Sequence, residues 1–172
     1  RPTAECIGQI THSRHVGILA TSGTISSGSY PLEIRKLYPD IVVSGEACPM
    51  WVPLVENYEY DSPGADYFVE KRIGNLLRKD PAIDTIVLGC THYPLLLNKI
   101  LKYTPRNVRI VPQGEYVAYS LKDYLQRHTE IETLCTQSGT CRFLTTESPD
   151  KFMESASIFL RQHVEAERVG LE

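Results

Sequence analysis

The sequence predicts an α/β protein built on a mostly parallel sheet. Short runs of β-branched and aliphatic residues alternate with longer amphipathic stretches, and this alternation is typical of a parallel sheet covered by helices. The clearest buried strands are His15–Ala20 and residues 84–88, because each is a nearly continuous apolar run followed by a turn. Two further strands are expected at residues 41–44 and 108–111.

Helices are expected between these strands, over residues 27–38, 64–78, 94–101 and 115–127. In residues 64–78, apolar side chains recur at helical spacing, and Asp61-Ser62-Pro63 supplies a helix start signal. Two prolines break the stretch 48–56, so a loop with one short helix is expected there.

After Pro112 the sequence predicts too few strands and helices for a complete α/β domain. The pattern there contains one long helix, a hairpin around residues 137–145 and a last helix that starts at Ser148-Pro149. We therefore expect residues 1–112 to form a three-layer α/β domain. We expect residues 113–172 to be the crossover, terminal strand and helices of a second domain, most of which lies outside this chain.

The ends of the chain agree with this division. The chain begins at Arg1 rather than Met, so the natural start is expected upstream. The Leu171-Glu172 pair is left out of the fold prediction, because it could be native or a remnant of an affinity tag.

Composition excludes several classes of function. The 172 residues carry a formal net charge of −3 without a basic cluster, so nucleic acid is not an expected partner. No apolar run approaches the roughly 20 residues of a membrane span. The five cysteines form no CxxC pair, which disfavours a zinc site and disulfides. Neither a metal nor a membrane is expected, and free thiols favour the cytoplasm.

The segment Gly89-Cys90-Thr91-His92-Tyr93-Pro94 carries the chemistry that the residues indicate most clearly. It joins the strand 84–88 to a helix, and ligands of parallel α/β sheets bind at the carboxyl ends of strands. A helix N-terminus next to Cys90 would favour its thiolate, and His92 could carry a proton near neutral pH. The alternative is a buried cysteine that only fills space.

The same segment, extended to Leu95-Leu96, resembles the second-cysteine motif of glutamate racemases. Other segments resemble this family in the same order, so the resemblance runs from about residue 12 to about residue 162. They are Thr21 to Tyr30, Ala47-Cys48-Pro49, Val52 to Glu56, Gln113-Gly114-Glu115 with Ala118, and Leu144-Thr145-Thr146 with Pro149 and Phe152.

The resemblance implies two pseudo-symmetric α/β domains that interconvert L- and D-glutamate for peptidoglycan without a cofactor or metal. One cysteine from each domain removes or returns the α-proton. It implies catalytic roles for Cys90 and His92, substrate binding by Thr91, His92, Thr21 and Thr24, and a supporting role for Glu56, which orients His92.

One part of the family pattern has no counterpart here. The family's opening segment, which carries the first cysteine, is absent, so the chain alone is expected to be inactive. An aspartate or hydantoin racemase of the same superfamily, and a non-catalytic flavodoxin-like binding domain, remain alternatives. Family members are often homodimers. Tyr58, Tyr60 and Tyr67 would suit either a subunit contact or an exposed cluster.

Overall fold

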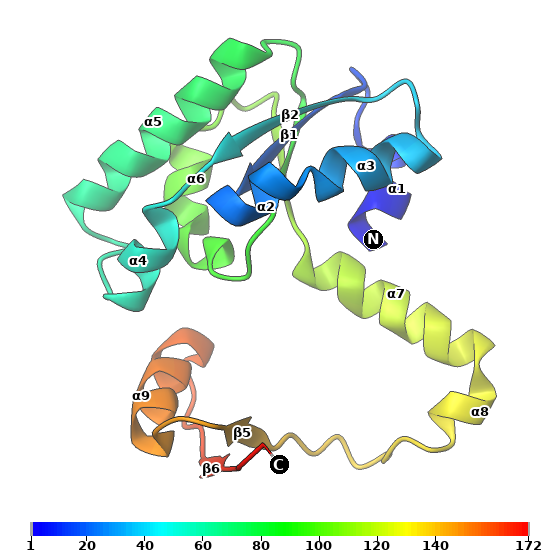
Figure 1. Ribbon diagram of the computed structural model, residues 1–172, viewed down its shortest axis with the longest axis vertical. Coiled ribbons are helices and arrows are strands. Elements are labelled where there is room, and N and C mark those ends of the chain that lie inside the picture. The colour runs from blue at the N-terminus through cyan, green and yellow to red at the C-terminus, as the bar shows by residue number, and fades with distance from the viewer. Residues whose placement is uncertain (1, 172) are drawn as a thin grey trace. The chain divides into compact units, whose positions relative to one another are not determined.

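The computed structural model describes residues 2–171, so the expectations about Arg1 and Glu172 fall outside the described residues. The chain divides into two compact units, Arg1–Tyr124 and Leu125–Glu172 (Figure 1). Helix α7 (Gly114–Arg127) runs through the boundary between them. The division predicted after residue 112 concerns a second domain beyond this chain, and it stays a prediction.

The first unit alternates strands with helices along most of its length. In chain order its elements are α1 (Pro2–Ile10), β1 (His15–Ala20), α2 (Ser22–Ser27), α3 (Ser29–Leu37), β2 (Val42–Ala47), α4 (Trp51–Glu56), α5 (Pro63–Lys79), β3 (Thr85–Leu88), the 3-10 helix η1 (Tyr93–Leu96), α6 (Leu97–Tyr103), β4 (Arg109–Pro112) and most of α7.

The four strands form one parallel sheet in the order β2-β1-β3-β4. β1 pairs with β2 through His15↔Val42 and with β3 through Val16↔Thr85, and β3 pairs with β4 from Thr85↔Arg109. The predicted α/β class with a parallel sheet is therefore confirmed. Because all four strands run in one direction, their carboxyl ends meet at a single edge of the sheet.

Helices cover both faces of this sheet, as Figure 1 shows for α5 and α6 on one side and α1 and α3 on the other. Val16 and Ile18 of β1 belong to the core that includes Ile34 of α3. On the opposite face, a Cβ at Gly17 would lie 2.7 Å from Leu76 Cδ2 of α5. The missing side chain at Gly17 therefore lets α5 approach the sheet closely.

Helix α1 was not expected from the sequence. It buries its apolar face in the core, and Asp84 fixes the chain that follows it. The Asp84 carboxylate accepts hydrogen bonds from Thr11 Oγ1 (2.6 Å) and from the backbone N–H groups of His12 and Ser13 (2.7 Å each). These bonds hold the pKa of Asp84 below its usual range, although burial acts in the opposite direction.

The helix expected over residues 27–38 is α3, and a separate short helix, α2, precedes it. Gly28 adopts a left-handed conformation (φ 62°) between α2 and α3, and it is the C-cap of α2. The turn expected at Thr21-Ser22-Gly23-Thr24 is consequently the N-terminus of α2. Similarly, the helix expected at residues 94–101 begins as η1 and continues as α6.

The second unit contains the end of α7, α8 (Thr129–Glu132), β5 (Phe143–Thr145), α9 (Pro149–Leu160) and β6 (Ala166–Arg168). The predicted hairpin around residues 137–145 is wrong. β5 pairs in parallel with β6, through Phe143↔Ala166, across α9. The Ser138-Gly139 signal does mark a bend, with Gly139 at φ 65°, but the residues before it form the short helix α8 and a turn rather than a strand.

Candidate active site

The predicted site residues follow the carboxyl ends of two neighbouring strands. Thr21 follows β1, and Gly89-Cys90 follows β3. These strands are paired up to Leu19↔Leu88, so the two segments leave the sheet side by side. This edge is where parallel α/β folds bind ligands.

Gly89 allows the chain to turn at this point. Its N–H donates to Leu19 O at 2.7 Å, so the backbone lies tightly against the end of β1. A Cβ at position 89 would lie 2.9 Å from Ala20 Cβ and 3.3 Å from Leu19 O. Any larger residue would therefore push the start of the Cys90 loop away from the sheet.

Cys90, His92 and Glu56 form a connected set. The Cys90 sulfur lies 3.7 Å from His92 Nδ1, and the other ring nitrogen, Nε2, lies 3.4 Å from Glu56 Oε1. The His92 side chain is one-third exposed and that of Glu56 more than half exposed, so solvent screens this ion pair. Chemically, the arrangement can exchange a proton between the thiol and the imidazole.

Thr91 lies between these two residues and is exposed, so its hydroxyl and N–H are accessible to a ligand at the strand edge. Thr21 and Thr24 lie across from it at the start of α2. Their hydroxyl oxygens are 3.0 Å apart, and Thr24 N–H donates to Thr21 Oγ1 at 3.3 Å. Within residues 2–171, these two hydroxyls bond to each other rather than to the Cys90 loop.

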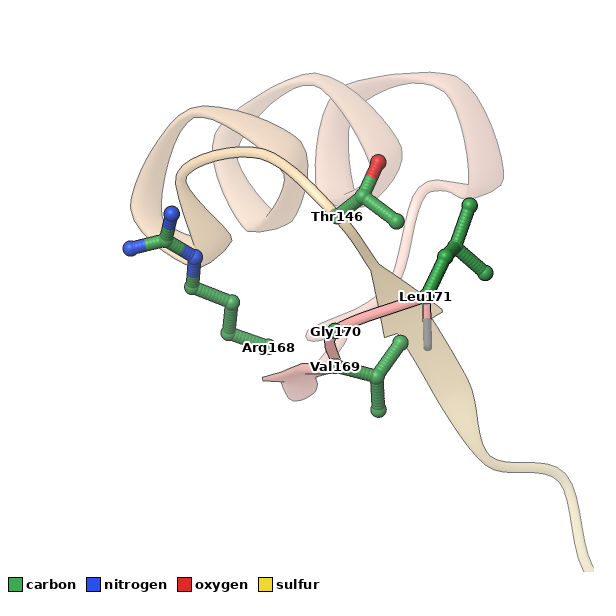
Figure 2. Close-up of a pocket in the computed structure, with 5 residues that line it drawn as sticks. All are labelled: Thr146, Arg168, Val169, Gly170 and Leu171. Carbon is green, nitrogen blue, oxygen red and sulfur yellow. The ribbon is translucent and has the colours of Figure 1, made fainter.

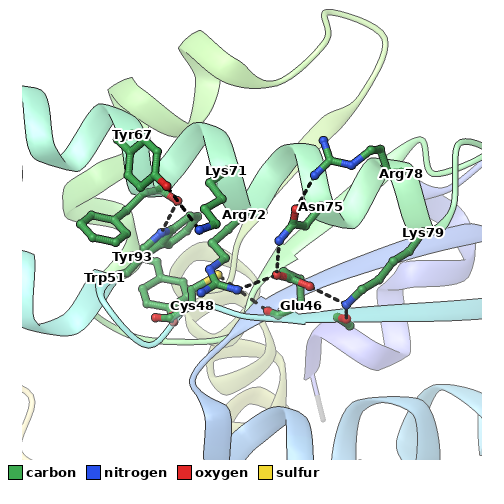
Figure 3. Close-up of polar contacts among 12 residues, drawn as sticks. Glu46, Cys48, Trp51, Tyr67, Lys71, Arg72, Asn75, Arg78, Lys79 and Tyr93 are labelled. Carbon is green, nitrogen blue, oxygen red and sulfur yellow. Dashed lines mark hydrogen bonds and ion pairs between the residues drawn. The ribbon is translucent and has the colours of Figure 1, made fainter.

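Behind the loop, Tyr93 links it to the end of β2 and to α4 (Figure 3). The Tyr93 hydroxyl donates to Cys48 O at 3.2 Å, and its ring meets that of Trp51 edge-on at 4.7 Å. Cys48, Trp51 and Tyr93 have no exposed surface. Burial raises the pKa of the Cys48 thiol and of the Tyr93 hydroxyl well above their usual ranges, so both groups are neutral.

Sequence reasoning missed Tyr30 and Gln113 as neighbours of the Cys90 loop. Gln113 Nε2 donates to Leu88 O at 2.9 Å and to the Tyr30 hydroxyl at 2.7 Å. The signal that could have found Gln113 is its position directly after β4, which matches that of Thr21 after β1. Tyr30 lies inside a helix, and no sequence rule would have placed its hydroxyl there.

A separate cavity lies in the second unit. It measures about 440 Å³ and is lined by Thr146, Arg168, Val169, Gly170 and Leu171 of the second unit (Figure 2). None of these side chains is a nucleophile or a proton carrier near neutral pH. The thiol and the imidazole lie at the Cys90 edge rather than in this cavity.

Two other classes of site are absent from residues 2–171. No group of three or more His, Cys, Asp or Glu side chains is arranged to hold a metal ion in that range. Over the same residues, no helix combines the length and apolar character that a membrane span requires.

The fold and the site together define an α/β protein with a thiol and an imidazole at the carboxyl edge of a parallel sheet. The Asp/Glu/Hydantoin racemase family model matches residues 3–115, which include the whole of this site. The chain belongs to the Asp/Glu/Hydantoin racemase family.

The relatives are glutamate racemases. The chain is 36% identical to the glutamate racemase of Thermoanaerobacter sp. (strain X514) over 162 residues, which cover 94% of this chain and 60% of that protein. It is 33% identical to that of Shouchella clausii, covering 96% of this chain and 59% of that protein. The chain thus spans about 60% of the length of these relatives.

Solved structures agree with this. A glutamate racemase isoform from Bacillus anthracis matches 99% of this chain and 62% of its own, with a TM-score of 0.89 and 33% identity. The glutamate racemase of Francisella tularensis, solved in complex with D-glutamate, matches 99% of this chain and 63% of its own, with a TM-score of 0.82 and 26% identity.

Proposed function

We propose that this chain supplies one half of a glutamate racemase active site, with Cys90 as one of two catalytic thiols. The observation that carries the proposal is the Cys90–His92–Glu56 set at the carboxyl edge of the sheet, in a chain whose relatives are named glutamate racemases. The substrate is glutamate, and the product D-glutamate serves peptidoglycan synthesis in a bacterial cytoplasm.

The chemistry follows from a thiol on each face of the substrate. The Cys90 thiolate takes the proton from Cα, so that the C–H electron pair stays on the substrate as a carbanion. A thiol on the opposite face then donates its proton to Cα and completes the inversion. In the reverse direction Cys90 is the proton donor, so each thiol alternates between acid and base.

His92 supports this cycle through its two ring nitrogens. Nδ1 faces the Cys90 sulfur at 3.7 Å and can accept or return its proton. Nε2 faces Glu56, whose carboxylate favours the tautomer with its hydrogen on that nitrogen, so that Nδ1 faces the sulfur as an acceptor. The exposed Thr91, with Thr21 and Thr24 across the strand edge, would supply hydroxyl and N–H donors for the carboxylates of glutamate.

The second thiol is proposed to come from a polypeptide segment outside these 172 residues. In the first unit, Cys48 is buried and neutral, and Cys6 packs against the core. The cysteines of the second unit, Cys135 and Cys141, are exposed and lie outside any family motif. The five free cysteines fit a reducing compartment. A homodimer is proposed on the family resemblance alone.

A chimera tests this function. The segment of the Thermoanaerobacter relative that precedes its matched region is fused in front of this chain, and folding is checked by circular dichroism. We expect the chimera to form D-glutamate from L-glutamate in the presence of EDTA and without an added cofactor. Preferential turnover of L-aspartate would instead indicate the aspartate-racemase alternative, and no turnover of either by a folded chimera would overturn the proposal.

The site assignment is tested in the same background. Cys90→Ala should lower turnover by about 10³-fold, because removal of a positioned acid or base typically costs 10²- to 10⁴-fold. Cys141→Ala is the matched control, because it removes an exposed thiol. Full turnover in the Cys90→Ala chimera would show that another group does the chemistry.

A further inference from the structure

The amide group of Gln113 is held in one orientation. Its Oε1 accepts from Thr3 Oγ1 at 2.9 Å, and its Nε2 donates to Leu88 O at 2.9 Å and to the Tyr30 hydroxyl oxygen at 2.7 Å. An amide nitrogen carries two hydrogens, and a backbone carbonyl can only accept. Both hydrogens are therefore committed, and a flipped amide would place two acceptors face to face at Leu88.

This orientation decides the direction of the Tyr30 proton. Because the Tyr30 oxygen accepts a hydrogen bond from Gln113, its own single proton points away from Gln113. No acceptor for that proton is found among residues 2–171. The ring lies against the Cys90 loop, since a Cβ on Gly89 would be only 3.3 Å from Tyr30 Cε2. The uncommitted donor is thus next to the residue that precedes Cys90.

The electrostatics agree with this placement. Burial raises the pKa of Tyr30, the hydrogen bond from Gln113 lowers it, and a negative charge on Cys90 raises it. The net effect keeps the phenol protonated at neutral pH, so it is a donor.

We propose that Tyr30, oriented by Gln113, donates a hydrogen bond to the Cys90 thiolate and stabilises it. This inference rests on the proposed role of Cys90 as a thiolate base. It gives the thiol two partners on different elements, the His92 imidazole on its own loop and the Tyr30 phenol on α3.

The other titratable groups around these two residues do not compete for the role. Facing Cys90, Tyr93 donates its proton to the Cys48 carbonyl, and Cys48 is itself a neutral, buried thiol. Facing Tyr30, Glu33 lines the same cavity of about 250 Å³, but it accepts from Lys36. Among these titratable groups, Tyr93 and Cys48 donate to backbone carbonyls, whereas the Tyr30 proton points away from its one printed partner, Gln113.

The test measures the alkylation rate of Cys90 by iodoacetamide in the 172-residue chain, resolved by peptide mass spectrometry, between pH 6 and 9.5. Tyr30→Phe removes one hydrogen bond to a charged group. At a pH where the thiol is mainly protonated, this loss should reduce the thiolate population about tenfold. The less stabilised thiolate is also the better nucleophile, with a Brønsted coefficient of about 0.4–0.5. We therefore expect alkylation about threefold slower at pH 6 and about threefold faster at pH 9.5.

This crossover distinguishes stabilisation of the thiolate from a general loosening of the loop, which would change the rate in one direction at every pH. Tyr38→Phe is the matched control. Tyr38 lies at the C-terminal end of α3, and its hydroxyl donates to Glu5 O of α1 at 2.6 Å. This substitution should leave both rates unchanged.

A second variant reverses the direction of the Tyr30 proton. In Gln113→Glu, the carboxylate can only accept, so it would draw the Tyr30 proton away from Cys90 and reproduce the crossover. Rates that shift in parallel, or do not shift, in both variants would overturn the role of Tyr30. That result would leave racemisation by the chimera unaffected, so the two proposals fail separately.

Discussion

The hydroxyl oxygen of Tyr93 lies 3.2 Å from the backbone carbonyl oxygen of Cys48. The same carbonyl also accepts from the backbone N–H of Trp51 at 3.2 Å. Tyr93 closes the turn that starts at Cys90, through a hydrogen bond from its N–H to Cys90 O at 3.3 Å. The loop that carries the thiol is thus fastened to α4, and the last residue of that helix is Glu56, the partner of His92.

Tyr93→Phe should lower the free energy of unfolding of the chain by about 1 kcal/mol, the usual net contribution of one hydrogen bond. Phenylalanine keeps the buried ring and its contact with Trp51, so only the hydroxyl is lost. Urea unfolding followed by circular dichroism measures the change. Tyr67→Phe is the control, because Tyr67 is exposed. Equal effects in the two variants would show that the Tyr93 hydroxyl contributes nothing specific.

Glu46 makes a buried charged contact with α5 behind the site (Figure 3). Its side chain is 6% exposed and receives hydrogen bonds from Arg72, Asn75 and Lys79 of α5. Glu46→Gln should lower the free energy of unfolding at pH 7 by about 2 kcal/mol, because hydrogen bonds to a charged group contribute about 1.5–3 kcal/mol. The same change at the exposed Glu70 of α5 should have little effect.

The effect of Glu46 should depend on pH in one direction. Burial raises its pKa, but the bonds from Lys79, Asn75 and Arg72 lower it further, so the folded-state pKa lies below the ordinary value. The stabilisation that the Glu46 carboxylate gives the fold is therefore complete above its unfolded-state pKa of about 4.3. It is lost as the pH falls through the folded-state pKa. The stability gap between the parent and Glu46→Gln should narrow below about pH 4. A gap that widens in acid would contradict this assignment.

Gly89→Ala should destabilise the first unit by about 1–3 kcal/mol, the usual cost of overpacking. Its Cβ would meet Ala20 and the backbone of Leu19 rather than a flexible side chain. Gly23→Ala is the contrasting control: a Cβ there meets nothing within 4 Å, and alanine favours the helix by about 0.5–1 kcal/mol. In thermal unfolding, the melting temperature should fall in Gly89→Ala and rise in Gly23→Ala. Equal shifts would contradict the packing argument.

The sequence was sufficient to predict the sheet because its two central strands, β1 and β3, are buried on both faces. His15–Ala20 and Thr85–Leu88 are apolar runs with no helical alternative of that length. Cys90, Thr91 and His92 could be found for the same reason, since they directly follow such a strand. Glu56, the partner of His92, lies 36 residues earlier in the chain, and only the family resemblance pointed to it.

Other features depend on contacts between distant residues, which no local pattern records. The chain that follows helix α1 is held by Asp84, more than 70 residues away. The parallel pairing of β5 with β6 depends on α9 returning the chain, and the Ser138-Gly139 turn signal favoured a hairpin instead. The Tyr30–Gln113 contact joins residues 83 positions apart, so neither residue's environment was visible in its own segment.

Cys48 and Cys90 should respond oppositely to alkylation of the folded chain. Cys48 is fully buried, and burial raises the pKa of its thiol, so it should remain unmodified until the chain unfolds. Cys90 is partly exposed beside His92 and should react at pH 7. Iodoacetamide labelling with and without urea, quantified for each cysteine by peptide mass spectrometry, measures the reactivity of both thiols. Labelling of Cys48 in the folded chain would show that the region around Tyr93 opens readily.

The 172-residue chain by itself should not racemise glutamate. Inversion at Cα needs an acid and a base on opposite faces, and the sheet edge of the first unit carries one reactive thiol, Cys90, since Cys48 is buried and neutral. The measurement is D-glutamate formation from L-glutamate, with the folded chimera as the positive control. Deuterium exchange at Cα provides a more sensitive assay, because one thiolate could still remove and return the proton on the same face. Exchange without inversion would support a single competent thiol at Cys90. Formation of D-glutamate by the isolated chain, abolished by Cys90→Ala, would mean that a second acid exists within these residues, and Cys135→Ala and Cys141→Ala would then identify whether it is a thiol of the second unit.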